Sequence, residues 1–272
     1  MKKPIISIIT INYNNAKGLK KTIESIINQN CDKALFEYIV IDGGSADESI
    51  ENIKSYEIFI DYWISEKDSG IYNAMNKGVQ QANGKYCLFV NSGDCLNSKD
   101  TIQRIIKTKP DKDIVMGNVG VFTSDSLWEA PDEESLSLIY LRDNPLAHPA
   151  ALIKTSLQKS LPYNETLRIC ADRQFFIEAL IIRNCSYAKI PVTINTFAPA
   201  GASGIENDEI MKKEEELILQ HYFQPRLMRD LNATNLTILQ TTKKMIRYFR
   251  LTKILCRLNN ALLDLVNFYH KK

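Results

Sequence analysis

The sequence predicts an α/β fold with a mostly parallel sheet, because apolar strands, polar turns and amphipathic helices alternate through about residue 120. With 272 residues, of which 44% are hydrophobic and 24% charged, the chain is long enough to bury a full core. Strands covered by helices on both faces read as near-continuous β-branched runs, and such runs recur here. In sheets of this kind ligands bind beyond the carboxyl ends of the strands.

The first predicted strand is the β-branched run Ile5 to Ile11, which ends in the polar segment Asn12 to Asn15. A helix is expected next, because apolar residues recur every three to four positions. These residues are Leu19, Ile23, Ile26 and Ile27.

A second strand over 38–41 closes on a polar turn that begins with Asp42. Ser45, followed three residues later by Glu48, matches a capping box and predicts that a helix starts there. Trp63 and Ile64 indicate a short third strand.

The segment from Ser65 to Asp94 is the most informative part of the chain. A turn over 68–70 precedes an amphipathic helix that ends at Gly84, and a short apolar strand follows over 86–90. Packing does not require an acid beyond that strand, and an isolated buried carboxylate is costly. Asp94 is therefore predicted to bind a cation or a substrate.

Beyond residue 124 the pattern is mixed, with a helix expected over 171–182 and a strand over 187–197 that extend the same core. A further helix is expected over 207–222. The tail from Thr241 is basic and amphipathic, which favours an anionic membrane surface. Packing of the tail on its own domain or on a second subunit is the open alternative.

Charge and motifs exclude several classes of function. A net charge of +2 does not indicate a nucleic-acid binder. The first turn, INYNNAKG, contains neither a dinucleotide-binding nor a nucleoside triphosphatase motif. The six cysteines lack C-x-x-C spacing, the N-terminus lacks a signal-peptide cleavage site, and no apolar run approaches the ~20 residues of a membrane span. A cytoplasmic protein is expected, with peripheral attachment to the inner face of the plasma membrane as an option through the tail.

Four segments together resemble the family 2 inverting glycosyltransferases, in the branch that builds bacterial surface polysaccharides. They are TINYN (10–14), VIDGGSAD (40–47), SEKDSGIYNAMNKG (65–78) and ANGKYCLFVNSGD (82–94). The resemblance implies an α/β, mostly parallel nucleotide-diphospho-sugar transferase (GT-A) sandwich over 1–204. Its nucleotide-binding half would span about 1–120 and its acceptor half about 121–204, and residues 205–272 would form a C-terminal helical extension.

The resemblance implies a UDP-sugar donor, with Thr10, Asn12 and Asp42 lining the nucleotide pocket and Asp68 at its edge. A carboxylate suits this role because uracil N3 presents a hydrogen-bond donor. The alternative for both acids is a role within a turn or at a helix start.

The family's metal motif carries two or three carboxylates, whereas this chain has Asn91, Ser92, Gly93 and Asp94. The resemblance implies Mn²⁺ or Mg²⁺ at Asp94, assisted by Asn91, with the remaining ligands from diphosphate and water. Met75 stands where many relatives have arginine, so Lys77 is expected to supply a phosphate contact.

Asp172, in CADRQFF, resembles the family's catalytic base, which takes the proton of the acceptor hydroxyl in a single inverting displacement. Its alternative role is to complement a helix dipole. His148, in LAHPAALIK, is expected to hydrogen-bond acceptor or phosphate, or else to be a turn residue. Ser203, in PAGASG, is expected to contact the diphosphate, or else to lie in a plain turn.

These expectations combine into one function. The enzyme would move a hexose or N-acetylhexosamine from a UDP-sugar to an undecaprenyl-diphosphate-linked saccharide in O-antigen, capsule or exopolysaccharide biosynthesis. The alternative is a non-catalytic sugar-nucleotide-binding protein, which the reduced metal motif suggests. A sugar nucleotidyltransferase is disfavoured because INYNN lacks a glycine-rich, basic phosphate loop.

Overall fold

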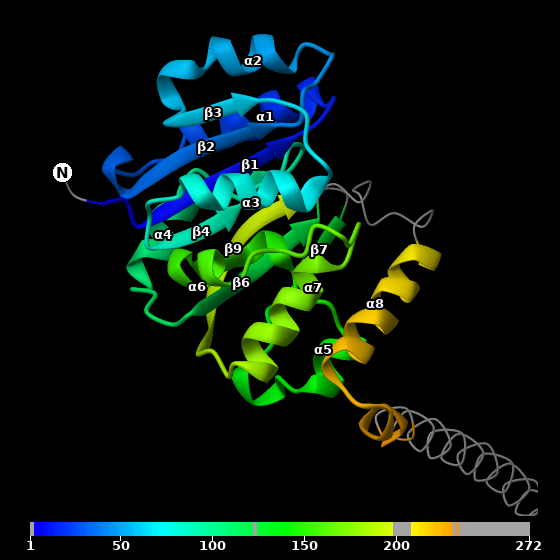
Figure 1. Cartoon of the computed structure of the whole chain (residues 1–272). Coiled ribbons are helices and arrows are strands. Elements are labelled where there is room, and N and C mark those ends of the chain that lie inside the picture. Colours follow the sequence, from blue (N-terminus) through cyan, green and yellow to red (C-terminus); the bar gives the residue numbers. More distant parts are fainter. Residues whose placement is uncertain (1–2, 122–123, 198–207, 231–232, 234–272) are drawn as a thin grey trace, which may run out of the picture. The chain divides into compact units, whose positions relative to one another are not determined.

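The computed structural model describes residues 3–121, 124–197, 208–230 and 233. The chain forms two compact units, 1–215 and 216–272. The elements discussed below and labelled in Figure 1 belong to the first unit, except for the last residues of one helix, 216–222. Ser203 and the basic tail after Thr241 lie outside the described residues.

A nine-stranded mixed sheet forms the centre of the described part of the first unit. Its order is β3-β2-β1-β4-β8-β6-β9-β5, with β7 paired to β6. The neighbouring strands β3, β2, β1 and β4 are parallel, while β8 pairs antiparallel with both β4 and β6. The strands are β1 (Ile6–Asn12), β2 (Phe36–Asp42), β3 (Tyr62–Ser65), β4 (Tyr86–Phe89), β5 (Cys95–Leu96), β6 (Ile114–Val121), β7 (Ser124–Trp128), β8 (Ala151–Lys154) and β9 (Tyr187–Phe197).

The helices predicted within the described residues are present in the expected order, and three further α-helices, Thr101–Lys107, Leu138–Asp143 and Thr155–Ser160, were not predicted individually. The helix expected over 171–182 has two parts, α7 and a π-helical segment Ile177–Ile182, and the helix expected over 207–222 is α8. The α-helices are α1 (Ala16–Ile27), α2 (Ser49–Ser55), α3 (Ile71–Gln81), α4 (Thr101–Lys107), α5 (Leu138–Asp143), α6 (Thr155–Ser160), α7 (Ala171–Phe176) and α8 (Asp208–Tyr222). Residues 208–215 of α8 belong to the first unit.

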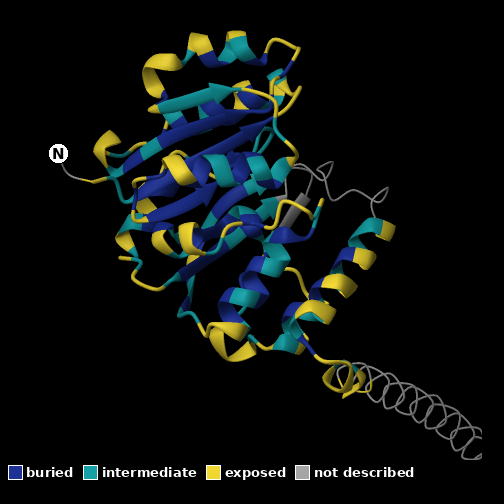
Figure 2. Cartoon of the chain, in the orientation of Figure 1, coloured by how far each residue is buried: buried dark blue, intermediate teal, exposed yellow. Residues whose placement is uncertain are grey.

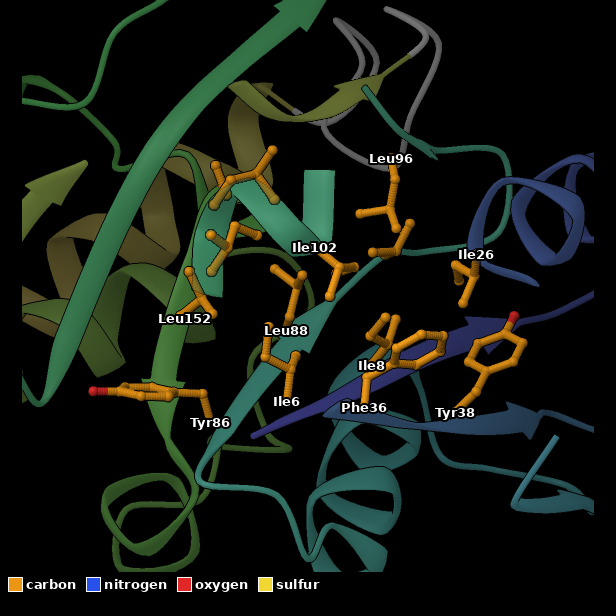
Figure 3. Packing of buried hydrophobic residues seen from close by; sticks show 14 of the residues in the cluster. Ile6, Ile8, Ile26, Phe36, Tyr38, Tyr86, Leu88, Leu96, Ile102 and Leu152 are labelled. Atoms are coloured by element: carbon orange, nitrogen blue, oxygen red, sulfur yellow. The ribbon is translucent and has the colours of Figure 1, made fainter. Parts of the chain in front are cut away.

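The parallel half of the sheet is covered on both faces, which explains its nearly uninterrupted apolar strands. On one face Ile8 and Tyr38 pack in a buried cluster with Ile26 of α1 (Figure 3). On the other face α3 lies close to β1, since a Cβ atom on Gly78 would come within 2.5 Å of the Ile9 side chain. Successive residues of a strand point to opposite faces, so Ile8 and Ile9 serve different layers. Figure 2 shows the resulting buried sheet with exposed outer helix surfaces.

One local prediction was wrong. The helix after β2 begins at Ser49, and Glu48 at its start makes no side-chain capping bond. Ser45 does not cap it, because the helix begins four residues later and the Ser45 oxygen already accepts from Asn14 N at 2.8 Å and from Asn12 Nδ2 at 3.2 Å. A cap needs this oxygen as an acceptor for helix N–H groups.

Over the residues that the structure describes, none of the helices combines the length and the apolar character needed to cross a membrane.

Candidate active site

The loops that follow β3, β2, β1 and β4 meet at one edge of the sheet, because these four strands are adjacent and parallel (Figure 1). Hydrogen bonds join the loops directly. Asn14 N donates to Ser45 Oγ at 2.8 Å, and Ala46 N donates to Asn14 Oδ1 at 2.8 Å. Asn15 Nδ2 donates to the Ser92 carbonyl at 3.1 Å, which brings the turn after β4 to the same edge.

Asp42 lies beneath this edge and has no exposed surface. Its carboxylate accepts four hydrogen bonds, from Asn12 Nδ2, from Ser65 Oγ and from both the amide and the hydroxyl of Ser45, at 2.6–2.9 Å. Burial acts to raise the pKa of Asp42, but these bonds outweigh it and the pKa is lowered. The carboxylate is therefore an ionised anchor that holds three strand ends together, which favours the turn role over direct contact with uracil.

Thr10 and Asn12 also serve the sheet interior. Thr10 Oγ1 donates to the Val90 carbonyl at 2.7 Å and accepts from the Tyr38 hydroxyl at 3.1 Å. Asn12 Nδ2 is shared between Asp42, Ser45 and Ser49. Asn12 Oδ1 is buried and has no hydrogen-bond partner among the described residues. Of these two predicted pocket residues, only Asn12 therefore keeps an unused polar atom.

The Asp68 side chain lies against Gly43, the residue that follows Asp42. A Cβ atom on Gly43 would lie 2.4 Å from Asp68 Oδ2 and 3.3 Å from a ring carbon of Tyr13, so a side chain here would displace the carboxylate. Asp68 Oδ1 accepts from Gly70 N at 3.0 Å, and residue Tyr13 is 65% exposed. An acidic oxygen and an open aromatic face thus lie over the same glycine. Sequence reasoning missed Tyr13, for which the adjacent polar strand end was the available signal.

Lys77 lies on α3 facing the loop after β3. Its ammonium forms an ion pair with Glu66 at 2.7 Å and donates to the Lys67 carbonyl at 3.5 Å. Exposed pairs of this kind contribute only about 0–1 kcal/mol. Glu66 is half exposed, so exchanging it for a phosphate would cost little.

Asp94 ends the turn after β4. Thr22 of α1 holds this turn, because its hydroxyl donates to the Asp94 carbonyl at 2.7 Å and accepts from Gly93 N at 3.0 Å. Burial raises the pKa of Asp94 to about 7, and the positive charge of Lys21 acts against this rise. Asn91 Oδ1 in the same turn is buried without a hydrogen-bond partner among the described residues.

The Asp94 carboxylate and the Asn91 amide oxygen are of the ligand types that hard divalent cations such as Mn²⁺ or Mg²⁺ prefer. Within the described ranges no group of three His, Cys, Asp or Glu side chains converges on a metal position. A cation at Asp94 would therefore take most of its ligands from a diphosphate and water, as Mg²⁺ commonly does.

Asp172 is the second residue of α7 and is tied to α3. Its Oδ1 accepts from the Tyr72 hydroxyl at 3.1 Å and from Arg173 N at 2.8 Å. Tyr72 follows Asp68 by four residues, a stretch of chain that spans at most about 14 Å. Asp68 is therefore one end of the short segment 68–72, and Asp172 is hydrogen-bonded to its other end, Tyr72.

The loop before Asp172 is held by α8. The buried carboxylate of Glu214 accepts three consecutive backbone N–H groups, those of Arg168, Ile169 and Cys170, at 2.6–3.0 Å. Arg173 forms an ion pair with Glu215. Sequence reasoning missed Glu214, because a glutamate within a run of charged residues reads as part of a solvated helix face.

His148 is buried in an aromatic cluster with Phe89, Tyr163 and Phe176. Its Nε2 shares a 2.6 Å hydrogen bond with the Tyr163 hydroxyl. Burial lowers the pKa of His148, and the charge of Asp172 acts against this change. A neutral, enclosed imidazole favours a structural role within this aromatic cluster over direct contact with a substrate.

Comparison with known proteins supports this picture. Residues 7–181 match the family model described as glycosyl transferase family 2. An uncharacterised glycosyltransferase of Mycobacterium tuberculosis is 32% identical over 197 residues, which cover 70% of this chain and 72% of the relative. A PGL/p-HBAD biosynthesis glycosyltransferase of Mycobacterium bovis is 32% identical over 184 residues, covering 65% of this chain and 70% of the relative.

Among solved structures, S. aureus TarS 1–349 in complex with UDP-GlcNAc has a TM-score of 0.62 and 18% identity, and the match covers 78% of this chain and 65% of TarS 1–349. The mannosyltransferase PcManGT from Pyrobaculum calidifontis, in complex with GDP-Man and Mn²⁺, has a TM-score of 0.56 and 16% identity, with coverages of 74% and 59%. The chain thus spans less than two thirds of these solved chains.

These structural likenesses confirm the predicted α/β GT-A fold with helices at its C-terminal end. The family model matches most of the sheet and includes the loops of Asp42, Asp68, Asp94 and Asp172. The chain belongs to glycosyl transferase family 2.

Proposed function

We propose that this protein is an inverting, metal-dependent glycosyltransferase that moves a hexose or N-acetylhexosamine from a UDP-sugar to a lipid-linked saccharide. The observation that carries the proposal is the short segment 68–72. Asp68, at one end of this segment, has a carboxylate that can bind a nucleotide base. Tyr72, at the other end, is hydrogen-bonded to Asp172, whose carboxylate can accept a proton.

The donor end of the site fits a uracil base. The exposed ring of Tyr13 offers a stacking surface, and Asp68 Oδ2 beside it accepts a hydrogen bond from N3–H. TarS, which shares the fold, was solved with UDP-GlcNAc, and this supports a UDP-sugar. Lys77 lies on the same helix as Tyr72. When the donor binds, the Lys77 ammonium leaves its ion pair with Glu66 and contacts a phosphate oxygen instead.

The chemistry is a single displacement. A divalent cation bound by Asp94 and Asn91 would supply positive charge to the departing diphosphate, and the PcManGT structure with Mn²⁺ supports its presence. Asp172 takes the proton of the acceptor hydroxyl as the oxygen attacks the anomeric carbon. The bond to the diphosphate breaks, its electron pair leaves with UDP, and the anomeric configuration inverts.

The acceptor is an undecaprenyl-diphosphate-linked saccharide of O-antigen, capsule or exopolysaccharide biosynthesis. Support for this part comes from the likeness to the surface-polysaccharide branch and from the basic residues interleaved with apolar ones after Thr241. The protein would act at the inner face of the plasma membrane.

Donor recognition is tested by Asp68→Ala. UDP binding should weaken tenfold or more, since hydrogen bonds to charged groups contribute about 1.5–3 kcal/mol. Isothermal titration with UDP and GDP measures this effect, and the wild type should prefer UDP and transfer label from a UDP-sugar.

Asp32→Ala is the matched control for Asp68→Ala. Asp32 Oδ1 also accepts from the amide two residues ahead, at 3.0 Å, but it lies in an exposed turn before β2. Its removal should leave UDP affinity unchanged. Equal UDP affinity in Asp68→Ala and wild type, or a wild type that prefers GDP, contradicts the proposed donor site.

A further inference from the structure

The Tyr72 hydroxyl faces two acceptors at once. It contacts the Ile169 carbonyl and, at 3.1 Å, Asp172 Oδ1. Tyr72 is 4% exposed, so its hydroxyl is shielded from bulk water. A hydroxyl has a single hydrogen, which can serve one of these acceptors fully at any moment.

Both hydrogen bonds that the described residues give to the Asp172 side chain, from Tyr72 and from Arg173 N, end on Oδ1. This arrangement leaves Oδ2 for the acceptor hydroxyl. It also fixes the carboxylate plane, because two donors from different elements meet the same oxygen.

We propose that Tyr72 is a positioning residue for Asp172. The hydrogen-bond acceptor that the Tyr72 hydroxyl chooses depends on whether Asp172 is ionised. The proposal rests on the function proposed above. While Asp172 is ionised, Tyr72 donates to Oδ1. Once Oδ2 has taken the proton of the acceptor hydroxyl, the carboxyl group is neutral and the Tyr72 hydroxyl turns to the Ile169 carbonyl. No proton leaves Tyr72 in either state.

The environment keeps Tyr72 a donor throughout. Burial raises the pKa of Tyr72 far above its ordinary value, and the charge of Asp172 adds to this rise. The tyrosine therefore stays protonated over the whole range in which an enzyme of this kind works.

Helix α3 holds the acceptor-half segment on which Asp172 sits. Asn73 Nδ2 and Asn76 Nδ2 each donate to Glu165 at 2.8 Å, and Asn76 Nδ2 also donates to the Tyr163 carbonyl at 2.9 Å. Three polar positions on one helix face, 72, 73 and 76, thus grip the segment 163–172 at both ends. These contacts fix the backbone on which Asp172 sits relative to helix α3.

Other charged or titratable groups near Asp172 act through space or through the backbone. Among the described residues, Tyr72 is the one that donates a side-chain hydrogen bond to its carboxylate. Replacing Tyr72 with phenylalanine therefore removes this contact, together with the one to the Ile169 carbonyl, and leaves the surrounding charges in place. The neighbouring groups are Arg173, Cys170, buried His148 and Tyr163, and Glu214 and Glu215 of α8.

The test is Tyr72→Phe, with Tyr56→Phe as the matched control. Tyr56 donates to Glu24 Oε1 at 2.8 Å, the same hydroxyl-to-carboxylate bond outside the site. The Asp172 carboxyl is followed by carbon-13 NMR over pH and assigned by its absence in Asp172→Asn. Because the ionised form loses a donor, the midpoint in Tyr72→Phe should move to higher pH than in the wild type.

Turnover supplies the second measurement. The acid limb of the kcat/KM profile should move to higher pH by the same amount in Tyr72→Phe, with UDP affinity unchanged, while Tyr56→Phe matches the wild type. A purely structural role would lower Tm without moving either the midpoint or the acid limb, and that result overturns the proposal. A shifted midpoint in a protein that transfers no sugar upholds the contact and refutes the proposed function instead.

Discussion

Replacing Asp172 with asparagine is expected to lower kcat for sugar transfer by about a thousandfold, within the range of about 10²–10⁴ that general bases contribute. Asparagine keeps the size of the side chain, and its Oδ1 still accepts from Tyr72 and Arg173 N. It cannot accept the proton of the acceptor hydroxyl. UDP affinity should stay within about twofold, because the donor contacts lie elsewhere.

The assay compares initial rates of labelled sugar transfer and UDP titrations for wild type, Asp172→Asn and Asp100→Asn. Asp100 lies at the start of α4 and contacts Asn30, outside the site. Its variant should match the wild type. Retention of most activity in Asp172→Asn refutes its role as the base, and UDP binding by a wild type without turnover supports the non-catalytic alternative.

Asp94→Asn is expected to reduce kcat/KM by about a hundredfold and to raise the Mn²⁺ concentration needed for half-maximal rate. At the same time it should make the protein more stable at pH 8. Burial raises the pKa of Asp94 to about 7, so the folded state holds its proton more tightly than the unfolded chain. The stabilising contribution of the Asp94 carboxyl group is present at about pH 4 and is lost as pH rises through about 7. Over this range the free energy of unfolding falls by no more than about 1.4 kcal/mol per pH unit.

Urea unfolding at pH 4 and pH 8 measures this difference, and Asp113→Asn gives the opposite sign. Hydrogen bonds from Ser186 and Lys154 lower the pKa of Asp113 to about 2, so its ionised form stabilises the fold and its removal should destabilise the protein at pH 8. A gain in stability for Asp94→Asn without any change in metal requirement would mean that Asp94 is an ordinary, partly buried acid and not a metal ligand.

The sequence located the edge of the sheet on which the site lies, because alternation of strands and helices places every strand end of a parallel sheet on one side. The sequence could not show which polar side chains at that edge remain available to a ligand and which are already hydrogen-bonded within the protein. Asp42 is fully engaged because Asn12 and Ser65, 30 and 23 positions away, converge on it. Which acid stays open depends on these long-range partners, and local sequence carries no information about them.

The positioning residues show the same limit. Tyr72 meets Asp172 across 100 positions, and Glu214 meets Ile169 across 45. The Ser45 to Glu48 pattern failed for the same reason, since the Ser45 oxygen accepts from Asn14 N, 31 positions away, and the helix begins only at Ser49. Periodicity predicts the elements, whereas pairing between distant loops decides what each polar side chain does.

The central claim is that Asp68, Asp94 and Asp172 all surround the same bound donor. A crystal structure of Asp172→Asn with Mn²⁺ and a UDP-sugar tests this claim most directly. We expect the uracil ring on Tyr13 with N3 facing Asp68, and the metal and diphosphate at Asp94. The substituted amide side chain at position 172 should face the anomeric carbon from the side opposite the diphosphate. A donor bound elsewhere, or a side chain at position 172 in a cavity that the sugar does not reach, would contradict the account.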